Sequence, residues 1–256
     1  MSEIESAKKE QKVLISNRYF ALCWRLLLVV CSLVGIPCIF MVSAGFHPEN
    51  QLYYFTMQTN FFVLFMFLFL VVKTIIQIAK EGKTGVVAHI NESLQLFVTF
   101  GITVTFLGYV VLLTGMGFTM AGVGVSPAKQ TMYEAGNWLV HIIVPFMCIA
   151  DWVMFMPHGN VKNKSVAYWL IYPLIYMVIL AIRATVTKDP VFVIASKNGV
   201  PVKSLYPYFF IAFENFEAWQ TTLILIALVL FFILFALLYI LIDKKIAKSI
   251  EKKHAK

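Results

Sequence analysis

The sequence predicts an all-α polytopic membrane protein with six transmembrane helices and both termini in the cytoplasm. Hydrophobic residues make up 60% of the 256 residues and charged residues only 13%, which lies outside the usual mix of a soluble domain. Six apolar stretches are each long enough, at roughly 20 residues, to cross a hydrocarbon core of about 30 Å as a helix. Lysine and arginine also collect on alternate connections between these stretches.

The six predicted spans form one transmembrane domain, residues 20–242, between a cytoplasmic segment 1–19 and a basic cytoplasmic tail 243–256. The spans are placed at 20–43, 52–78, 90–115, 137–156, 165–187 and 218–242. The apolar core of the first stretch exceeds the roughly 7 to 15 residues of a signal peptide, so we expect a helix that is retained.

The distribution of basic residues predicts the orientation. Lysine and arginine resist translocation and therefore mark cytoplasmic connections. They precede the first span, lie in the second-to-third and fourth-to-fifth connections, and follow the last span. The opposite connections carry only Lys129, Lys188, Lys197 and Lys203. We therefore expect a multi-pass protein of the plasma (cytoplasmic) membrane with both termini inside.

Composition also excludes several classes of function. The net charge of +8 does not indicate nucleic acid binding, because the basic residues are spread along cytoplasmic flanks rather than gathered in one basic module. We expect these lysines to contact anionic lipid headgroups. The histidines are dispersed without HExxH, and the cysteines lie in predicted spans without CxxC. We therefore expect no metal site and no cofactor.

The third outward connection, at about 188–217, has an unusual composition. It is too apolar for a solvated loop and too interrupted by proline and glycine for another span. Non-helical backbone at membrane depth is tolerated only where protein or a watery cavity satisfies it. We expect a re-entrant or interfacial segment above an outward cavity.

The stretch YYFTMQTN, residues 53–60, places polar side chains at the outer end of the second span. Residues three or four apart on a helix lie side by side. Thr56, Thr59 and Asn60 therefore share one face, whereas Gln58 points the other way. We expect the shared face to look into the protein.

The fourth span carries a second polar stripe, formed by Asn137, His141 and Pro145. Proline has no backbone N–H, so we expect Pro145 to release the carbonyl of His141 from its helical partner and to kink the helix there. A kink beside a histidine is a common way to open a site in a membrane helix.

Thr56, His141 and Arg183 lie at one depth, roughly 6 to 8 Å below the outer ends of three different spans. A threonine hydroxyl becomes a nucleophile when a nearby base takes its proton, and neutral histidine is the usual base. Arg183 or Asn60 can stabilise an oxyanion or hold a carboxylate. The structural alternatives remain open: a threonine that bonds its own helix, a histidine that packs, and an arginine that snorkels.

Asp151 is the other ionisable residue that we single out inside a span. Ten residues separate it from His141, or roughly 15 Å along the helix axis, so it is not expected to orient that ring. We expect it to cap its helix or to pair with Lys162 or Lys164.

Four segments together resemble the androgen-induced transmembrane hydrolase family and its bacterial six-span relatives. They are YFTMQTN, NWLVHIIVPFMCIADW, WLIYPLIY with Arg183 downstream, and LYPYFF. Eukaryotic members are threonine hydrolases of fatty acid esters of hydroxy fatty acids, with an intramembrane threonine and a histidine. The resemblance implies that the threonine is Thr56 and the histidine is His141, while Gln58 and Asn60 depart from the eukaryotic pattern.

The expected function is therefore an integral membrane hydrolase of lipid acyl esters that opens to the outer leaflet. Its catalytic residues would be Thr56 and His141, and its partner a membrane lipid or lipid-like ester substrate. The residues expected to bind substrate or the oxyanion are Asn60, Asn137, Arg183, Tyr176 and Tyr206. The alternative is a non-catalytic lipid-binding or small-molecule transport protein that uses the same outward cavity.

Overall fold

The computed structural model describes residues 13–42, 48–114, 126–197 and 200–254. Within these residues, six helices are long and apolar enough to cross a membrane, as predicted. Residues 1–12 of the predicted cytoplasmic segment lie outside the described residues. The described chain is thus a helical bundle whose elements follow the predicted order.

The first three spans are continuous helices. They comprise α2 (Arg18–Val42), α3 (Phe55–Glu81), preceded by the short turn η2 (Pro48–Tyr53), and α4 (Glu92–Leu107), continued by the π-helical segment η3 (Gly108–Thr114). The side chain of Asn91 caps α4 by accepting from the backbone N–H groups of Ser93 and Leu94. This cap fixes where the third span begins.

The last three spans include interruptions. They comprise α5 (Pro127–Trp138), the π-helical η4 (Leu139–Ile143) and α6 (Val144–Phe155); then α7 (Ser165–Trp169) and α8 (Ile171–Thr187); then α9 (Ala218–His254). The fourth span begins at Pro127 rather than at 137, because its first turns are polar and hydropathy does not detect them. The helix α9 continues through most of the basic tail.

The connection predicted as a re-entrant or interfacial segment contains the only strands among the described residues. They form a hairpin of β1 (Phe192–Lys197) and β2 (Val200–Ser204), with Phe192 opposite Ser204, followed by short turns η5 (Phe209–Ile211) and η6 (Phe213–Asn215). The purely helical prediction missed this hairpin. The sequence contains a signal for it, because Asn-Gly lies between two segments that contain valine, VFVIASK and VPVKS, and Asn-Gly between apolar segments is the strongest short-range sign of a hairpin.

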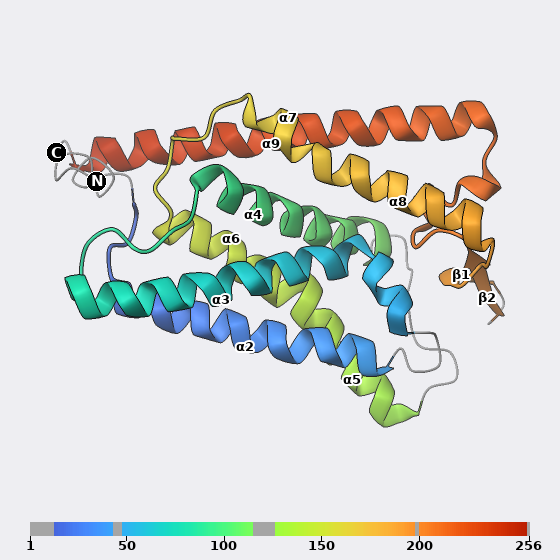
Figure 1. Ribbon diagram of the computed structural model, residues 1–256, viewed down its shortest axis with the longest axis horizontal. Helices are drawn as coiled ribbons and strands as arrows, with labels where there is room; N and C mark the ends of the chain where they lie inside the picture. The colour runs from blue at the N-terminus through green and yellow to red at the C-terminus, as the bar shows by residue number, and fades with distance from the viewer. Residues whose placement is uncertain (1–12, 43–47, 115–125, 198–199, 255–256) are drawn as a thin grey trace.

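The bundle has two distinct ends (Figure 1). We call the end where α2 begins and α9 finishes the basic end, and the end that carries η2 and β1–β2 the hairpin end. At the hairpin end, Phe55 packs with Tyr176, Tyr206 and Ile211, so the connection before α9 is joined to α3 and α8 by apolar contacts.

Two glycines allow the fourth span to pack closely against α2. A Cβ on Gly136 would lie 2.8 Å from the Cβ of Cys38, and a Cβ on Gly35 would lie 2.7 Å from that of Leu139. Real Cβ atoms do not approach so closely, so these positions need glycine for the observed packing. The close contact positions η4, which carries His141, against the core.

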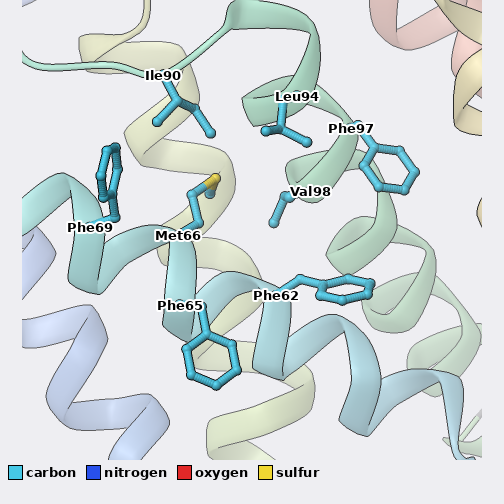
Figure 2. A pocket seen from close by; sticks show the side chains of 8 residues that line it. All are labelled: Phe62, Phe65, Met66, Phe69, Ile90, Leu94, Phe97 and Val98. Atoms are coloured by element: carbon cyan, nitrogen blue, oxygen red, sulfur yellow. The ribbon is translucent and has the colours of Figure 1, made fainter.

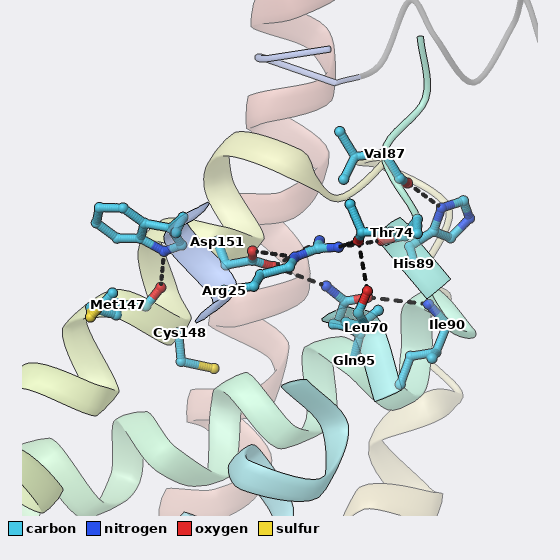
Figure 3. A network of polar contacts seen from close by, with 12 residues as sticks. Arg25, Leu70, Thr74, Val87, His89, Ile90, Gln95, Met147, Cys148 and Asp151 are labelled. Carbon is cyan, nitrogen blue, oxygen red and sulfur yellow. Dashed lines mark hydrogen bonds and ion pairs between the residues drawn. The ribbon is translucent and has the colours of Figure 1, made fainter. Parts of the chain in front are cut away.

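Toward its basic end, the bundle holds a fully buried ion pair between Arg25 on α2 and Asp151 on α6 (Figure 3). Nε of Arg25 lies 2.8 Å from Oδ1 of Asp151, and Nη2 lies 3.2 Å from Oδ2. Such two-pronged pairing suits the planar guanidinium and is the strongest form of carboxylate recognition.

The remaining polar groups around this pair are also satisfied. Nη1 of Arg25 donates to Oγ1 of Thr74 on α3 at 3.0 Å and to the carbonyl of Ala88 at 2.7 Å. Gln95 on α4 approaches Oδ2 of Asp151 at 3.5 Å. One guanidinium therefore joins α2, α3, α6 and the connection before α4, so that removing it leaves several buried groups without partners.

The prediction that Asp151 pairs with Lys162 or Lys164 is wrong. Its partner is Arg25, 126 residues earlier in the chain. Sequence spacing favours lysines close in sequence, whereas the low dielectric of the core requires a partner that can be desolvated with the carboxylate. Guanidinium is more weakly hydrated than ammonium and meets that requirement better.

A second buried cluster fixes the basic end of α9. Asp243 on α9 accepts from Nδ1 of His158 at 2.7 Å, from the indole of Trp152 at 3.2 Å and from the backbone N–H of Gly159 at 2.7 Å. Nε2 of His158 faces the carbonyl of Val153 at 3.1 Å. Both ring nitrogens therefore lie within hydrogen-bond distance of acceptors, which fixes the orientation of the ring between α9 and the end of α6.

We expect Arg25→Leu to lower the free energy of unfolding by about 3 to 5 kcal/mol, because it leaves the Asp151 carboxylate buried and unpaired. The measurement is thermal or denaturant unfolding of the purified protein in detergent. Lys83→Leu, which removes an exposed charge at the same end, is the control and should change stability little.

The double variant Arg25→Leu/Asp151→Leu separates two causes of the lost stability: the unpaired Asp151 carboxylate, and the missing hydrogen bonds of Arg25 between the helices. Replacing both charges of a buried pair by apolar groups is often nearly neutral, so the part of the cost that comes from the orphaned carboxylate should return, while the Ala88 carbonyl still lacks its donor. A double variant as unstable as Arg25→Leu alone would contradict the assignment of the cost to an orphaned carboxylate.

Candidate functional site

The two predicted catalytic residues lie toward the hairpin end on neighbouring elements. Thr56 is in the first turn of α3, and His141 is in the π-helical segment η4. Both side chains are half-buried. Asn60, one turn after Thr56, is the residue that connects them.

Asn60 is fully buried and holds the two elements together through its amide nitrogen. Nδ2 donates to the carbonyl of Thr56 at 2.9 Å and to the carbonyl of Val140 at 3.1 Å. Oγ1 of Thr59 also donates to the carbonyl of Thr56, at 3.0 Å. The turn that carries Thr56 is therefore fixed beside the residue that precedes His141.

The carbonyl of Val140 needs this donor because of the local helix geometry. In η4 the backbone bonds span five residues, as shown by the Val144 N–H, which donates to Leu139. The next donor in this register would be residue 145, which is proline and has no N–H. Pro145 therefore leaves Val140 without its helical donor, and the Asn60 amide replaces it.

This finding corrects the predicted consequence of Pro145. The sequence argument assumes α-helical spacing and assigns the released carbonyl to His141, four residues earlier. The π-helical spacing of η4 shifts the released carbonyl by one residue, to Val140. The carbonyl released beside the histidine is therefore that of Val140, and it accepts a hydrogen bond from the Asn60 side chain on α3.

The ring of His141 is oriented by its own helix and by an aromatic neighbour. Nδ1 lies 3.1 Å from the carbonyl of Asn137 and must therefore carry the hydrogen that is donated. The neutral ring then has its lone pair on Nε2. Tyr109, from η3, stacks on the ring with centroids 4.3 Å apart and planes at 22°.

The hydroxyl of Thr56 contacts Tyr208 in the segment between β2 and η5. Oγ1 of Thr56 lies 3.5 Å from the phenolic oxygen, which also accepts from the Thr56 backbone N–H at 3.4 Å. Burial raises the pKa of Tyr208, so the phenol stays protonated at neutral pH. Among the described residues, Thr56 and His141 share no hydrogen bond.

Tyr208 is a site residue that the sequence argument missed. The LYPYFF segment contains both tyrosines, and the sequence argument assigns substrate binding to Tyr206 rather than to Tyr208. Tyr206 packs against Phe213, with ring centroids 5.1 Å apart, whereas Tyr208 packs against Tyr54 beside Thr56. The segment has no regular secondary structure and therefore no periodicity. Only the path of the folded backbone determines that Tyr208, rather than Tyr206, faces α3.

Arg183 has a different environment from the one expected. It is buried, its Nη1 donates to the carbonyl of Leu205 at 3.0 Å, and its guanidinium lies 5.1 Å from the ring of Tyr53 and 4.6 Å from that of Phe192. Cation–π contacts of this kind stabilise a desolvated guanidinium. Arg183 therefore joins α8 to the connection at the hairpin end.

The other predicted binding residues also make backbone contacts. Tyr176 donates its hydroxyl to the carbonyl of Tyr53 at 2.8 Å. Asn137 supplies the carbonyl that orients His141, and both N–H groups of Asn60 are occupied. These residues hold the site in place. The polar groups of the site that remain for chemistry include the Thr56 hydroxyl, the Tyr208 hydroxyl, Nε2 of His141 and Oδ1 of Asn60, which is buried without a hydrogen-bond partner among the described residues.

Comparison with known proteins does not assign this site. The chain matches no family model, no curated protein and no solved structure. Among the described residues, no group of three or more histidine, cysteine, aspartate or glutamate side chains could hold a metal ion. Its chemistry must therefore be inferred from the side chains themselves.

We expect Asn60→Leu to destabilise the protein by about 1 to 3 kcal/mol, because it leaves the buried carbonyl of Val140 without a donor. The same substitution in a Pro145→Ala background should cost less, since alanine restores a backbone N–H at residue 145. Denaturant unfolding of the four proteins in this double-mutant cycle gives the coupling energy. Equal costs in the two backgrounds would contradict the proposed exchange of donors.

Proposed function

We propose that the protein is a membrane-embedded ester hydrolase in which Thr56 is the nucleophile and His141 the general base. The observation that carries this proposal is the orientation of His141. Its Nδ1 is committed to the Asn137 carbonyl, so Nε2 offers a lone pair, and Asn60 holds this turn against that of Thr56. A nucleophile needs such an oriented base.

The reaction would proceed in two steps. Thr56 Oγ1 attacks the ester carbonyl carbon while Nε2 of His141 takes the hydroxyl proton; the carbon–oxygen bond to the alcohol then breaks, and the alcohol leaves with that proton. A water molecule attacks the acyl-threonine by the same route and releases the carboxylic acid. Catalytic hydrogen bonds often tighten only in the substrate complex, so the nucleophile–base bond would form there.

Tyr208 is the residue best suited to stabilise the oxyanion. Its oxygen accepts the Thr56 N–H, its proton is retained at neutral pH, and it lies next to Oγ1. Donors aimed at the developing negative charge are the largest single contribution in acyl transfer. Asn60 and Arg183, which the sequence argument favoured, donate to backbone carbonyls instead.

A lipid acyl ester is the substrate class that fits the surroundings. Six helices of the described residues are long and apolar enough to cross a membrane. At the hairpin end the site has aromatic neighbours, since Tyr54 contacts the ring of Tyr208 and Tyr109 stacks on His141. The distribution of lysines favours an orientation with both termini in the cytoplasm, in which the hairpin end would face the outer leaflet of the plasma membrane. The resemblance to transmembrane threonine hydrolases supports the same assignment.

One observation favours a second candidate, a non-catalytic lipid-binding or transport protein. Among the described residues the Thr56 hydroxyl has Tyr208 rather than His141 as its side-chain partner, and a threonine with such a partner can be structural. This candidate predicts retained lipid in the purified protein without turnover of any ester.

Labelling with a fluorophosphonate probe tests the hydrolase. Thr56→Ala should abolish labelling, and His141→Ala should slow it by about 10² to 10⁴-fold because the base is lost. Tyr208→Phe should slow it by about 10²-fold if the phenol stabilises the oxyanion. The measurement is labelling rate in detergent, followed by hydrolysis of a panel of lipid esters.

Thr185→Ala is the matched control, because that threonine is exposed on α8 and bonds only its own helix. It should label like the parent protein. If Thr56→Ala and His141→Ala proteins also label like the parent, the Thr56–His141 mechanism is wrong and the lipid-binding candidate is favoured.

A further inference from the structure

An apolar cleft opens on the flank of the bundle between α3 and α4. Its volume is about 460 Å³, which is within the range of small-molecule sites. One wall comes from α3 and the other from α4 and the residue before its cap (Figure 2). The lining residues are Phe62, Phe65, Met66, Phe69, Ile90, Leu94, Phe97 and Val98.

The two helices are close at one end of this cleft and apart along it. Near the hairpin end, Oγ1 of Thr59 lies 2.8 Å from Oγ1 of Thr105, and Gly101 of α4 faces the Thr59 side chain. Farther along α3 the facing residues become aromatic, and their rings leave a cleft rather than filling it. The cleft therefore runs from the Phe62 level toward the basic end.

Lys73 lies at the basic end of the cleft. Its Nζ is 5.7 Å from the ring centroid of Phe69, which lines the cleft, and donates to the carbonyl of His89 at 2.7 Å. His89 immediately precedes Ile90, another lining residue. Lys73 is half-buried and forms no ion pair with the described acidic residues; the carboxylate of Glu92 instead faces Nε2 of His89, at 3.5 Å.

We propose that this cleft binds an anionic phospholipid, with one acyl chain between α3 and α4 and the phosphate at Lys73. An ammonium group that has one carbonyl acceptor can donate to phosphate oxygens with its other hydrogens. Lys73 donates to the carbonyl of His89, two residues before the Asn91 cap of α4. Lys73 therefore lies at the depth where the third span begins. Headgroups meet helix ends at this depth.

A lipid fits the cleft better than a protein segment does. The outer lining residues Phe65 and Phe69 are 64% and 54% exposed on an apolar helix flank, which faces hydrocarbon in a membrane. The cleft offers no polar group along its length, only the cation at one end. One apolar chain ending in one negative charge matches that pattern. The proposal does not rest on the hydrolase, because Lys73 and Thr56 lie far apart along α3.

Lipid binding to the purified protein, measured by native mass spectrometry, tests the proposal. Phosphatidylglycerol and phosphatidylcholine with identical acyl chains are compared, so that only the headgroup charge differs. We expect phosphatidylglycerol to bind more tightly. Lys73→Gln should weaken phosphatidylglycerol binding about fivefold, which corresponds to about 1 kcal/mol. It should weaken phosphatidylcholine binding less, because the choline group already neutralises the phosphate of that lipid.

Two pairs of variants separate the headgroup from the chain. Lys73→Arg should keep the preference for phosphatidylglycerol, and Lys80→Gln, which removes an exposed charge on the same helix, should not reduce it. Leu94→Trp places a bulky ring in the cleft and should weaken both lipids. Ile75→Trp is its control, because Ile75 is similarly exposed, 49% against 51%, but does not line the cleft.

The headgroup site would be overturned if the Lys73→Gln protein bound phosphatidylglycerol as tightly as the parent. It would also be overturned if Lys80→Gln lost as much phosphatidylglycerol affinity as Lys73→Gln. Equal lipid binding by Leu94→Trp and Ile75→Trp would overturn the chain site. Fluorophosphonate labelling of Lys73→Gln should match the parent, which distinguishes failure here from failure of the proposed hydrolase.

Discussion

The buried pair of Arg25 and Asp151 is the interaction on which the arrangement of the bundle depends. Each charge is costly to bury alone, so α2 and α6 must meet where the two groups can bond, and Thr74 and the Ala88 carbonyl must be present to satisfy the rest of the guanidinium. This requirement sets the relative positions of three helices and of the connection before α4. Apolar side chains pack in many ways, whereas a buried ion pair accepts few arrangements.

The candidate site follows the same principle of satisfying buried polar groups. The π-helical spacing of η4 and Pro145 leave the Val140 carbonyl without a helical donor, and Asn60 supplies one from α3. That bond aligns the turn of Thr56 with the turn of His141. The π-helical irregularity of η4 thus positions α3 through the Asn60 hydrogen bond. The same bond places Thr56 and His141, the two proposed catalytic residues, on adjacent turns.

The roles of the polar residues were harder to predict than their location. Depth and helical faces brought Thr56 and His141 together on the basis of sequence, and the structure puts them on elements joined by Asn60. Asn60 and Arg183 nevertheless donate to backbone carbonyls, and Tyr208 is the side chain at the Thr56 hydroxyl. A donor's partner depends on which carbonyls the folded backbone leaves unsatisfied, and that cannot be read from spacing.

The sequence by itself determined six apolar spans in order and the shared faces of the polar residues, because helix length and 3.6-residue periodicity are local properties. Only the tertiary structure decided the long-range partners: Arg25 for Asp151, His158 for Asp243, and the amide of Asn60 for Val140. These pairs join residues far apart in the chain. Each exists because a buried charge or carbonyl must find a partner in the packed core, and packing alone determines which one is near.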